Sequence, residues 1–234
     1  MKCIILNSGM GTRLKELTEN NPKSLVKLSD SETIFSKAVS ILKQFDIDEF
    51  IITTGYLSEI LQEYSLRHFP QINFTFVHNP VYDKTNYIKS LDLIGDIDDD
   101  VILLHGDLVF SKNVASKIIN AENTSVVVDS TIDLPKDDFK AKIQDDSVKY
   151  IGVDYFGEDA VACQPFYKLS KKDWKSWKDK INEFCINGDT NVYAENALNQ
   201  ITSDVKVYPM DIKGDICMEI DNKEDLLKVK EILQ

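Results

Sequence analysis

A short stretch near the start of the chain combines two glycines with basic side chains. It reads Leu6-Asn7-Ser8-Gly9-Met10-Gly11-Thr12-Arg13, and Pro22-Lys23 follows shortly after it. Glycines let the backbone turn sharply and approach a ligand without a Cβ in the way. Backbone N–H groups in such a turn bind anions, and Arg13 and Lys23 add positive charge. The combination predicts a site for a nucleoside triphosphate.

The spacing of these glycines differs from two common phosphate-binding loops. A P-loop requires four residues between its first Gly and a Gly-Lys-Ser/Thr triplet, which is absent here. A dinucleotide fingerprint requires a third Gly where this chain has Leu14. A glycine-rich turn without a ligand remains the alternative, but the preceding apolar strand and the following Pro-Lys pair argue against it.

Two acidic residues end apolar strands that lie far apart in the sequence. Asp107 ends the run 101–107, and Asp221 ends the run 216–221. Because strand ends of an α/β sheet face the ligand crevice, both carboxylates can converge on one Mg²⁺, which prefers oxygen ligands. Glu219 points to the same side as Asp221, so it can hold a metal-bound water or Lys23. In the alternative, Asp221 only caps the helix that follows.

The elements that position these residues alternate between strand and helix. Apolar runs predict strands near residues 3–6, 49–54 and 72–77, and helical periodicity predicts helices over 33–45 and 57–68. This order predicts a parallel sheet covered by helices on both faces. Ligands of such sheets bind beyond the carboxyl ends of the strands, where the Gly loop lies.

The next segment starts a helix with residues that also suit a ligand site. Thr85 and Asn86 are good N-cap residues, and capping alone can explain them. A helix start can also bind an anion, so capping and ligand contact stay equal alternatives.

The later part of the chain predicts an antiparallel extension that walls a second substrate pocket. Strands are expected over four segments separated by short polar turns: 125–129, 139–144, 148–153 and 160–167. A strand over 204–211, the strand at 216–221 and a helix over 222–233 close the chain. We treat residues 1–234 as one domain with a nucleotide-binding half (1–123), an acceptor-binding region (124–203) and a metal strand with its closing helix (204–234).

Several residues of the middle region are candidates for contact with the second substrate. Lys140 can reach a phosphate or be a solvated strand lysine. Trp174 and Trp177 lie on the helix 171–185 and fit either a cage for a quaternary ammonium group or a core stripe, which the spacing favours. Glu195 and Asn196, which follow Tyr193, can face an amine or merely favour the helix dipole.

Composition excludes several classes of protein. The net charge of −12 argues against nucleic acid as a partner. No apolar run is long enough to cross a bilayer, and no signal peptide is visible. The four cysteines are scattered, so we expect reduced thiols in the cytoplasm rather than disulfides or a zinc site. The sequence leaves the oligomeric state open, a homo-oligomer included.

The strand, Gly-x-Gly-Thr-Arg and Pro-Lys together resemble the signature of the nucleotidyltransferases. The resemblance is strongest to short bacterial CTP:phosphocholine cytidylyltransferases and their phosphonate-using relatives. One departure is Asn7-Ser8, where many members have Ala-Ala or Ala-Gly. The resemblance implies a three-layer α/β/α Rossmann-like fold with a mainly parallel mixed sheet. It also implies Mg²⁺ as cofactor and a role in making cell-surface or capsule precursors.

The resemblance also implies a reaction and residue roles. An acceptor oxygen attacks the α-phosphorus of CTP and releases pyrophosphate; the acceptor is a phosphorylated or phosphonate amine or alcohol, such as phosphocholine or 2-aminoethylphosphonate. An amino-acid-like acceptor such as glutamine, a sugar 1-phosphate, and a non-catalytic nucleotide-binding module are the alternatives. The implied catalytic groups are Lys23, Arg13, Asp107 and Asp221, and the last two are also the implied metal ligands. The residues implied to bind the nucleotide are Leu6, Asn7, Ser8, Gly9, Met10, Gly11, Thr12, Arg13, Lys23, Thr85, Asn86, Ser90 and Asp107. Those implied to bind the acceptor are Lys140, Tyr193, Glu195, Asn196 and Glu219.

Overall fold

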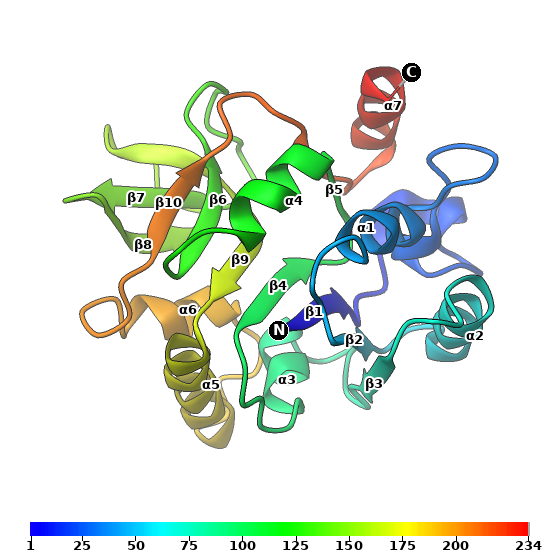
Figure 1. The fold of residues 1–234 in the computed structure, drawn as a ribbon, viewed down its shortest axis with the longest axis horizontal. Helices are drawn as coiled ribbons and strands as arrows, with labels where there is room; N and C mark the ends of the chain where they lie inside the picture. The colour runs from blue at the N-terminus through cyan, green and yellow to red at the C-terminus, as the bar shows by residue number, and fades with distance from the viewer. Residues whose placement is uncertain (234) are drawn as a thin grey trace.

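The first half of the chain forms parallel strands joined by helices. The computed structural model describes residues 1–233 (Figure 1). Strand β1 lies in the middle and pairs in parallel with β2 on one side and β4 on the other. The elements of this half, in chain order, are β1 (Lys2–Asn7), α1 (Ile34–Leu42), β2 (Glu49–Thr54), α2 (Ser58–His68), β3 (Phe74–His78), α3 (Tyr87–Asp92) and β4 (Val101–His105).

The second half completes the same sheet and adds a small hairpin. The strand order is β10-β6-β9-β4-β1-β2-β3. Strand β9 is antiparallel to both β4 and β6, so the other strands of this row share one direction. The hairpin of β7 and β8 extends from β9. These elements are β6 (Ser125–Asp129), β7 (Lys140–Gln144), β8 (Ser147–Gly152), β9 (Ala160–Leu169), α5 (Lys171–Ile186), α6 (Ala194–Asn199) and β10 (Tyr208–Asp211).

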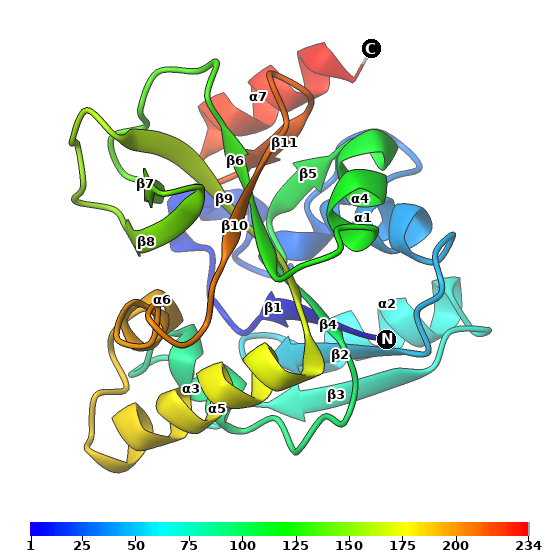
Figure 2. The same ribbon diagram turned by 60° about the vertical axis from the view of Figure 1, so that its left-hand side comes forward.

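Helices cover both faces of the sheet, as the strand alternation requires. Helices α3, α5 and α6 pack on one face, and α1, α2 and α4 (Lys112–Ile119) pack on the other (Figure 2). Successive residues of β1 alternate between the two cores, so Ile4 belongs to the first and Ile5 to the second. The predicted three-layer α/β arrangement is confirmed.

A separate two-stranded sheet joins distant parts of the chain. Strand β5 (Leu108–Phe110) pairs antiparallel with β11 (Cys217–Glu219), and Glu219 lies opposite Leu108. Helix α7 (Lys223–Ile232) follows β11 and packs over a third core that contains Leu14 and Val109. This pairing brings the residues after β4 beside the residues after β11.

Some element boundaries differ from the sequence-based expectations. Helix α4 and strand β5 were not predicted; Ser111 caps α4 by accepting from the N–H of Val114. The strand expected over 204–211 begins only at Tyr208, because the N–H groups of Asp204 and Val205 turn back to the carbonyl of Ile201. Similarly, β3 begins at Phe74, two residues later than expected, because Ile72 closes a turn with Phe69.

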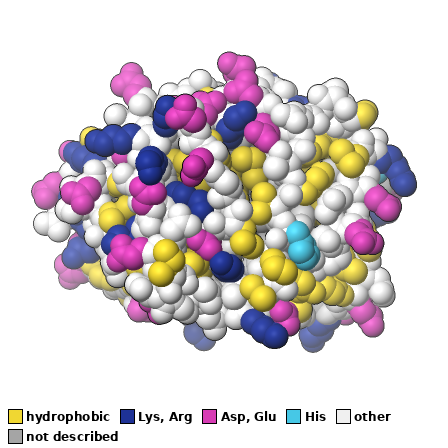
Figure 3. Space-filling model, turned by 90° about the horizontal axis from the view of Figure 1, so that it is seen from below, with side chains coloured by type: hydrophobic (Ala, Val, Ile, Leu, Met, Phe, Trp, Pro, Cys, Tyr) yellow, Lys and Arg dark blue, Asp and Glu magenta, His cyan; other side chains and the backbone are white. Residues whose placement is uncertain are grey.

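Charged side chains of both signs are mixed on the surface. On the face drawn in Figure 3, acidic and basic side chains are interspersed and no continuous basic patch is visible. Among residues 1–233, no helix is both long enough and apolar enough to cross a bilayer.

Candidate active site

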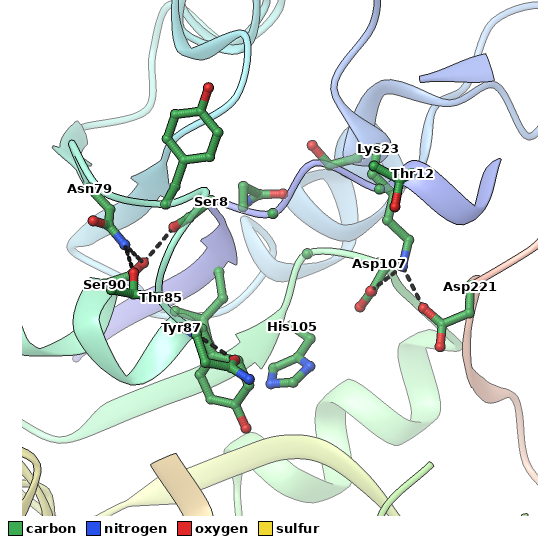
Figure 4. Close-up of a pocket in the computed structure, with 18 of the residues that line it drawn as sticks. Ser8, Thr12, Lys23, Asn79, Thr85, Tyr87, Ser90, His105, Asp107 and Asp221 are labelled. Atoms are coloured by element: carbon green, nitrogen blue, oxygen red, sulfur yellow. Dashed lines mark hydrogen bonds and ion pairs between the residues drawn. The ribbon is translucent and has the colours of Figure 1, made fainter. Parts of the chain in front are cut away.

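A cleft of about 390 Å³ lies at the carboxyl ends of the central parallel strands. Residues from the Gly loop, the β3–α3 segment and the β4–β5 turn form its walls. Figure 4 shows that charged groups cluster at one end and hydroxyl groups at the other. The cleft is lined by Leu6, Asn7, Ser8, Gly9, Gly11, Thr12, Arg13, Lys23, Ser24, Asn79, Tyr82, Thr85, Asn86, Tyr87, Ser90, His105, Gly106, Asp107, Asn191 and Asp221.

The Gly loop is shaped so that Lys23 can pass beside it. Gly11 has a φ of +62°, and a Cβ at this position would lie 2.9 Å from the Cβ of Lys23. The hydroxyl of Thr18 donates to the carbonyl of Gly11 at 2.9 Å and fixes the turn. Pro22 then precedes a short 3₁₀ turn over Lys23–Leu25, as the restricted backbone around a proline predicts. The chain therefore bends back and directs Lys23 into the cleft.

Lys23 joins the two carboxylates that the sequence analysis singled out. Its Nζ lies 2.6 Å from Oδ2 of Asp107 and 2.7 Å from Oδ1 of Asp221. Arg13 also reaches Oδ1 of Asp221 at 2.7 Å, although its own side chain is 64% exposed. The β5–β11 pairing is what brings Asp107 and Asp221 together. We call Arg13, Lys23, Asp107 and Asp221 the charged cluster.

Asp221 does not cap the helix after it. Asn222 is the N-cap of α7, and its side chain accepts from the N–H groups of Glu224 and Asp225. The carboxylate of Asp221 remains directed at Lys23 and Arg13. The capping alternative for Asp221 is therefore excluded by this geometry.

Within the charged cluster, Lys23 and Asp107 stabilise each other's charged forms. Burial acts to lower the pKa of Lys23, but the charges of Asp107 and Asp221 outweigh it and raise that pKa above its ordinary value. Burial acts to raise the pKa of Asp107, but the nearby Lys23 and His105 hold it below its ordinary value. Lys23 is therefore a protonated ammonium group beside the ionised carboxylate of Asp107 at neutral pH.

Three buried polar atoms of this cleft lack a hydrogen-bond partner within residues 1–233. They are Oδ1 of Asp107, Nε2 of His105 and Oγ of Ser24. Buried polar atoms in folded proteins nearly always have a partner, so these atoms indicate a place for ligand or solvent. A carboxylate oxygen is the donor type that Mg²⁺ prefers, and the free oxygen of Asp107 beside Asp221 fits that ion.

Glu219 lies beside His105 rather than beside Lys23. Its Oε1 is 3.2 Å from Nδ1 of His105. Burial raises the pKa of Glu219 to about 7, against the effect of the His105 hydrogen bond. His105, Asp107 and Glu219 also present ligand atoms within 4.8 Å of one another, so Asp107 has a second group of potential metal ligands besides Asp221.

Aromatic rings surround His105 next to the cleft. The ring centroids of Tyr87 and His105 are 4.7 Å apart, and those of Phe139 and Tyr193 are 5.0 Å apart. Glu195 lies beneath them, 1% exposed, and accepts hydrogen bonds from the hydroxyls of Tyr87 and Tyr167. We call Tyr87, His105, Phe139 and Tyr193 the aromatic cluster.

The start of α3 serves both roles that the sequence left open. The side chain of Asn86 caps the helix by accepting from the N–H of Tyr87 at 2.7 Å. Thr85 and Asn86 also line the cleft. Capping and cleft contact are therefore compatible at this position.

Some predicted residues lie away from the cleft. Met10 is not among its lining residues, and Asn196 is exposed. Trp174 and Trp177 are core residues; they are 1% and 0% exposed, and the indole of Trp177 donates to the carbonyl of Ala194. The core alternative for this helix is thus the correct one, and the cage is not formed by these tryptophans.

Lys140 neither reaches the cleft nor faces solvent. Its side chain is fully buried, and Nζ lies within hydrogen-bond distance of four backbone carbonyls, those of Pro135, Lys136, Asp138 and Val153, among which it shares its three protons. Nζ also lies 4.1 Å from the ring centroid of Phe156. Both sequence alternatives for Lys140 differ from the structure: the ammonium group holds residues 135–138 against the end of β8, next to Phe139 of the aromatic cluster.

Sequence reasoning missed several cleft residues. His105, Tyr87, Asn79, Tyr82 and Asn191 line the cleft but were not proposed as site residues. Asn79 is 1% exposed, and its position directly after β3 was the available signal. Asn191 reaches the cleft because the carbonyl of Thr190 accepts from the N–H of Asn86, which no local pattern predicts.

The sequence profile of the nucleotidyl transferase family matches residues 2–141, which is more than half of the chain. The chain belongs to the nucleotidyl transferase family. The match includes the Gly loop, Lys23 and Asp107, whereas Asp221 lies beyond it.

Individual relatives within this family are cytidylyltransferases. The chain is 32% identical to CTP:phosphoglutamine cytidylyltransferase of Campylobacter jejuni over 56% of this chain and 53% of that protein, so it spans about half the length of this relative. It is 28% identical to choline-phosphate cytidylyltransferase of Streptococcus pneumoniae over 100% of this chain and 99% of that protein. The solved structure of the Streptococcus pneumoniae CTP:phosphocholine cytidylyltransferase superposes with a TM-score of 0.81 at 23% identity, covering 100% of this chain and 99% of that one.

We predict that Lys140 is required to hold the wall beside the aromatic cluster. Lys140→Met keeps the apolar stem but removes the donor shared by four partly buried carbonyls, which should cost about 1–3 kcal/mol of unfolding free energy. Hydrogen exchange should accelerate in residues 135–139. Lys142→Met, on the same strand but partly exposed, is the matched control. Equal stability and exchange in both variants would contradict the assignment.

Proposed function

We propose that this chain is a Mg²⁺-dependent cytidylyltransferase that joins CTP to a phosphate or phosphonate bearing an amine, and releases pyrophosphate. The charged cluster carries the proposal, because it places two cationic side chains and two carboxylates at one end of a nucleotide-sized cleft. The relatives that use phosphocholine and phosphoglutamine support the cytidylyl group and this acceptor class. CTP is a cytoplasmic substrate, so the proposed site of action is the cytoplasm.

The triphosphate would lie along the Gly loop towards the charged cluster. The net charge of −12 opposes an anionic ligand at long range, so local groups must supply the attraction. Arg13 and the backbone N–H groups of the loop would hold the β- and γ-phosphates. The base would then lie at the hydroxyl end of the cleft, near Ser8 and Ser90.

The acceptor would lie at the aromatic cluster, whose Tyr87 and His105 line the same cleft as the charged cluster (Figure 4). Aromatic faces attract ammonium groups, and Tyr193 is 37% exposed, so its ring is accessible. Behind the rings, buried Glu195 and Glu219 place carboxyl oxygens on Tyr87 and His105, respectively. Glu195 would act through Tyr87, whose hydroxyl it holds, rather than through direct contact with the amine.

The reaction needs no protein nucleophile. An anionic oxygen of the acceptor attacks the α-phosphorus of CTP, and the bond to the bridging oxygen breaks so that pyrophosphate leaves with the electron pair. Lys23 would lie between the α-phosphate and the attacking oxygen and neutralise the charge that gathers there. Holding both substrates in line supplies the remaining rate acceleration.

Asp107 and Asp221 would hold Mg²⁺ beside the α-phosphate. Their convergence on one ammonium nitrogen and the unpartnered Oδ1 of Asp107 support this assignment. The bound ion would neutralise phosphate charge and fix the orientation of the triphosphate. Lys23 already lies where the two carboxylates meet, so it must share them when the ion binds.

A product assay tests the proposal. Pyrophosphate release should require CTP together with an amine-bearing acceptor, with phosphocholine, 2-aminoethylphosphonate and phosphoglutamine in the panel. Release with a sugar 1-phosphate, and not with these acceptors, would instead identify a sugar-nucleotide enzyme. Nucleotide binding without release for any acceptor would identify a non-catalytic module.

Lys23→Ala should separate catalysis from nucleotide binding. A cation at the attacking oxygen acts mainly in the transition state, so kcat should fall by about 10²–10³-fold while the KM for CTP changes less. Lys27→Ala, an exposed lysine nearby, is the control and should behave like the wild type. A folded Lys23→Ala protein with less than a roughly tenfold loss in kcat would remove Lys23 from the mechanism.

A further inference from the structure

Three hydroxyl groups line the end of the cleft away from the charged cluster. Hydrogen bonds link them into one network with buried residues of the core. The three hydroxyl groups belong to Ser8, Thr85 and Ser90 (Figure 4). Ser8 is 7% exposed and Ser90 is 0% exposed. A hydroxyl group has one proton to donate and lone pairs to accept. The direction of each hydrogen bond therefore decides what this end of the cleft offers to a ligand.

Asn79 sets the direction for Thr85 and Ser90. The N–H of Val81 donates to Oδ1 of Asn79 at 3.1 Å, which identifies that atom as the oxygen. Nδ2 must then donate, and it lies 3.1 Å from Oγ of Ser90 and 3.2 Å from Oγ1 of Thr85. Both hydroxyls accept from Asn79, and their own protons must go elsewhere.

Those protons all have acceptors inside the protein. Thr85 donates to the carbonyl of Val81 at 2.9 Å. Ser8 donates to Oγ1 of Thr53 at 3.0 Å. The bond of 2.7 Å between Ser8 and Ser90 then uses the proton of Ser90, because that of Ser8 is already committed. Every hydroxyl proton is directed inward, and the cleft is left with oxygen lone pairs.

Oxygen lone pairs favour a ligand group that donates a hydrogen bond. Cytosine carries an amino group at C4, which donates, whereas uracil carries an oxygen at C4, which only accepts. An oxygen placed against these hydroxyl groups would meet lone pairs and lose its hydrogen bond with water. The same ring is therefore accepted or rejected at a single substituent.

We propose that Thr53 determines the preference for CTP over UTP, although it is fully buried and does not line the cleft. It acts through Ser8: its Oγ1 accepts the one proton that could otherwise turn towards the base. Oγ1 of Thr53 also accepts from the N–H of Asn7, the last residue of β1, at 3.0 Å, so both lone pairs of this oxygen are used by donors from Asn7 and Ser8. The inference rests on the proposed use of CTP and names the residue that enforces it.

Thr53→Val tests this directly, because valine keeps the shape and removes the acceptor. The proton of Ser8 then has no partner in the core and can donate to the C4 oxygen of uracil. Titrations of CTP and UTP into the same protein, without acceptor, should show a wild-type preference for CTP of roughly tenfold or more. In Thr53→Val this ratio should fall by about that factor, mainly through tighter UTP binding.

Two variants separate hydrogen bonding from a structural effect. Thr54→Val removes an equally buried hydroxyl from the next residue of β2, one that contacts His78 rather than Ser8, and should keep the wild-type ratio. Thr53→Ser restores the acceptor and should restore the preference. If Thr53→Val does not fold, Ser8→Ala decides: CTP binding should weaken while UTP binding does not.

The outcomes are distinguishable from failure of the proposed function, because binding is measured without the transfer reaction. Equal binding of CTP and UTP by the wild type, or an unchanged ratio in folded Thr53→Val, would overturn the role of Thr53 even if CTP is turned over. An equal fall of the ratio in Thr53→Val and Thr54→Val would also overturn it, since packing and not proton direction would then be the cause.

Discussion

The ammonium group of Lys23 is the point on which the site depends. It holds Asp107 from the β4–β5 turn and Asp221 from the segment after β11 at hydrogen-bond distance, although nearly half of the chain separates these residues. Without a cation between them, two partly buried carboxylates would repel each other. The β5–β11 pairing and the missing Cβ of Gly11 both serve this arrangement, since one brings the carboxylates together and the other lets Lys23 reach them.

Much of the fold could be predicted from the sequence, because its signals are local. Apolar runs mark β1, β2 and β4, and helical periodicity marks α1, α2 and α5. The resulting alternation of strands and helices requires a layered sheet. The residues of the Gly loop were also predictable, since glycine spacing and the Pro-Lys pair constrain the backbone in place. The sequence also predicted that Asp107 and Asp221 would meet, on the argument that strand ends share one edge. The structure brings them together differently, through the separate β5–β11 pairing.

The remaining features depend on contacts that no local pattern records. The ammonium group of Lys140 is surrounded by carbonyls from two separate segments, so an apparent surface lysine is a buried one. Glu195 looked like a partner for an amine, but its carboxylate is occupied by Tyr87 and Tyr167. His105 is recognised as a site residue only from its contact with Glu219. Asn79 is recognised only from its hydrogen bonds to the hydroxyl groups of Thr85 and Ser90. Direction of hydrogen bonding is likewise a property of the assembled network, not of residue type.

On the proposed function, the charged cluster receives the triphosphate together with a metal ion. Calorimetric titration of CTP into the protein, in Mg²⁺ and in EDTA, tests this most directly. Binding should be at least roughly tenfold tighter in Mg²⁺, because Asp107 and Asp221 otherwise repel the phosphates, and this difference should disappear in Asp107→Asn. Equal affinity of the folded wild type in Mg²⁺ and in EDTA would contradict a metal-assisted triphosphate site.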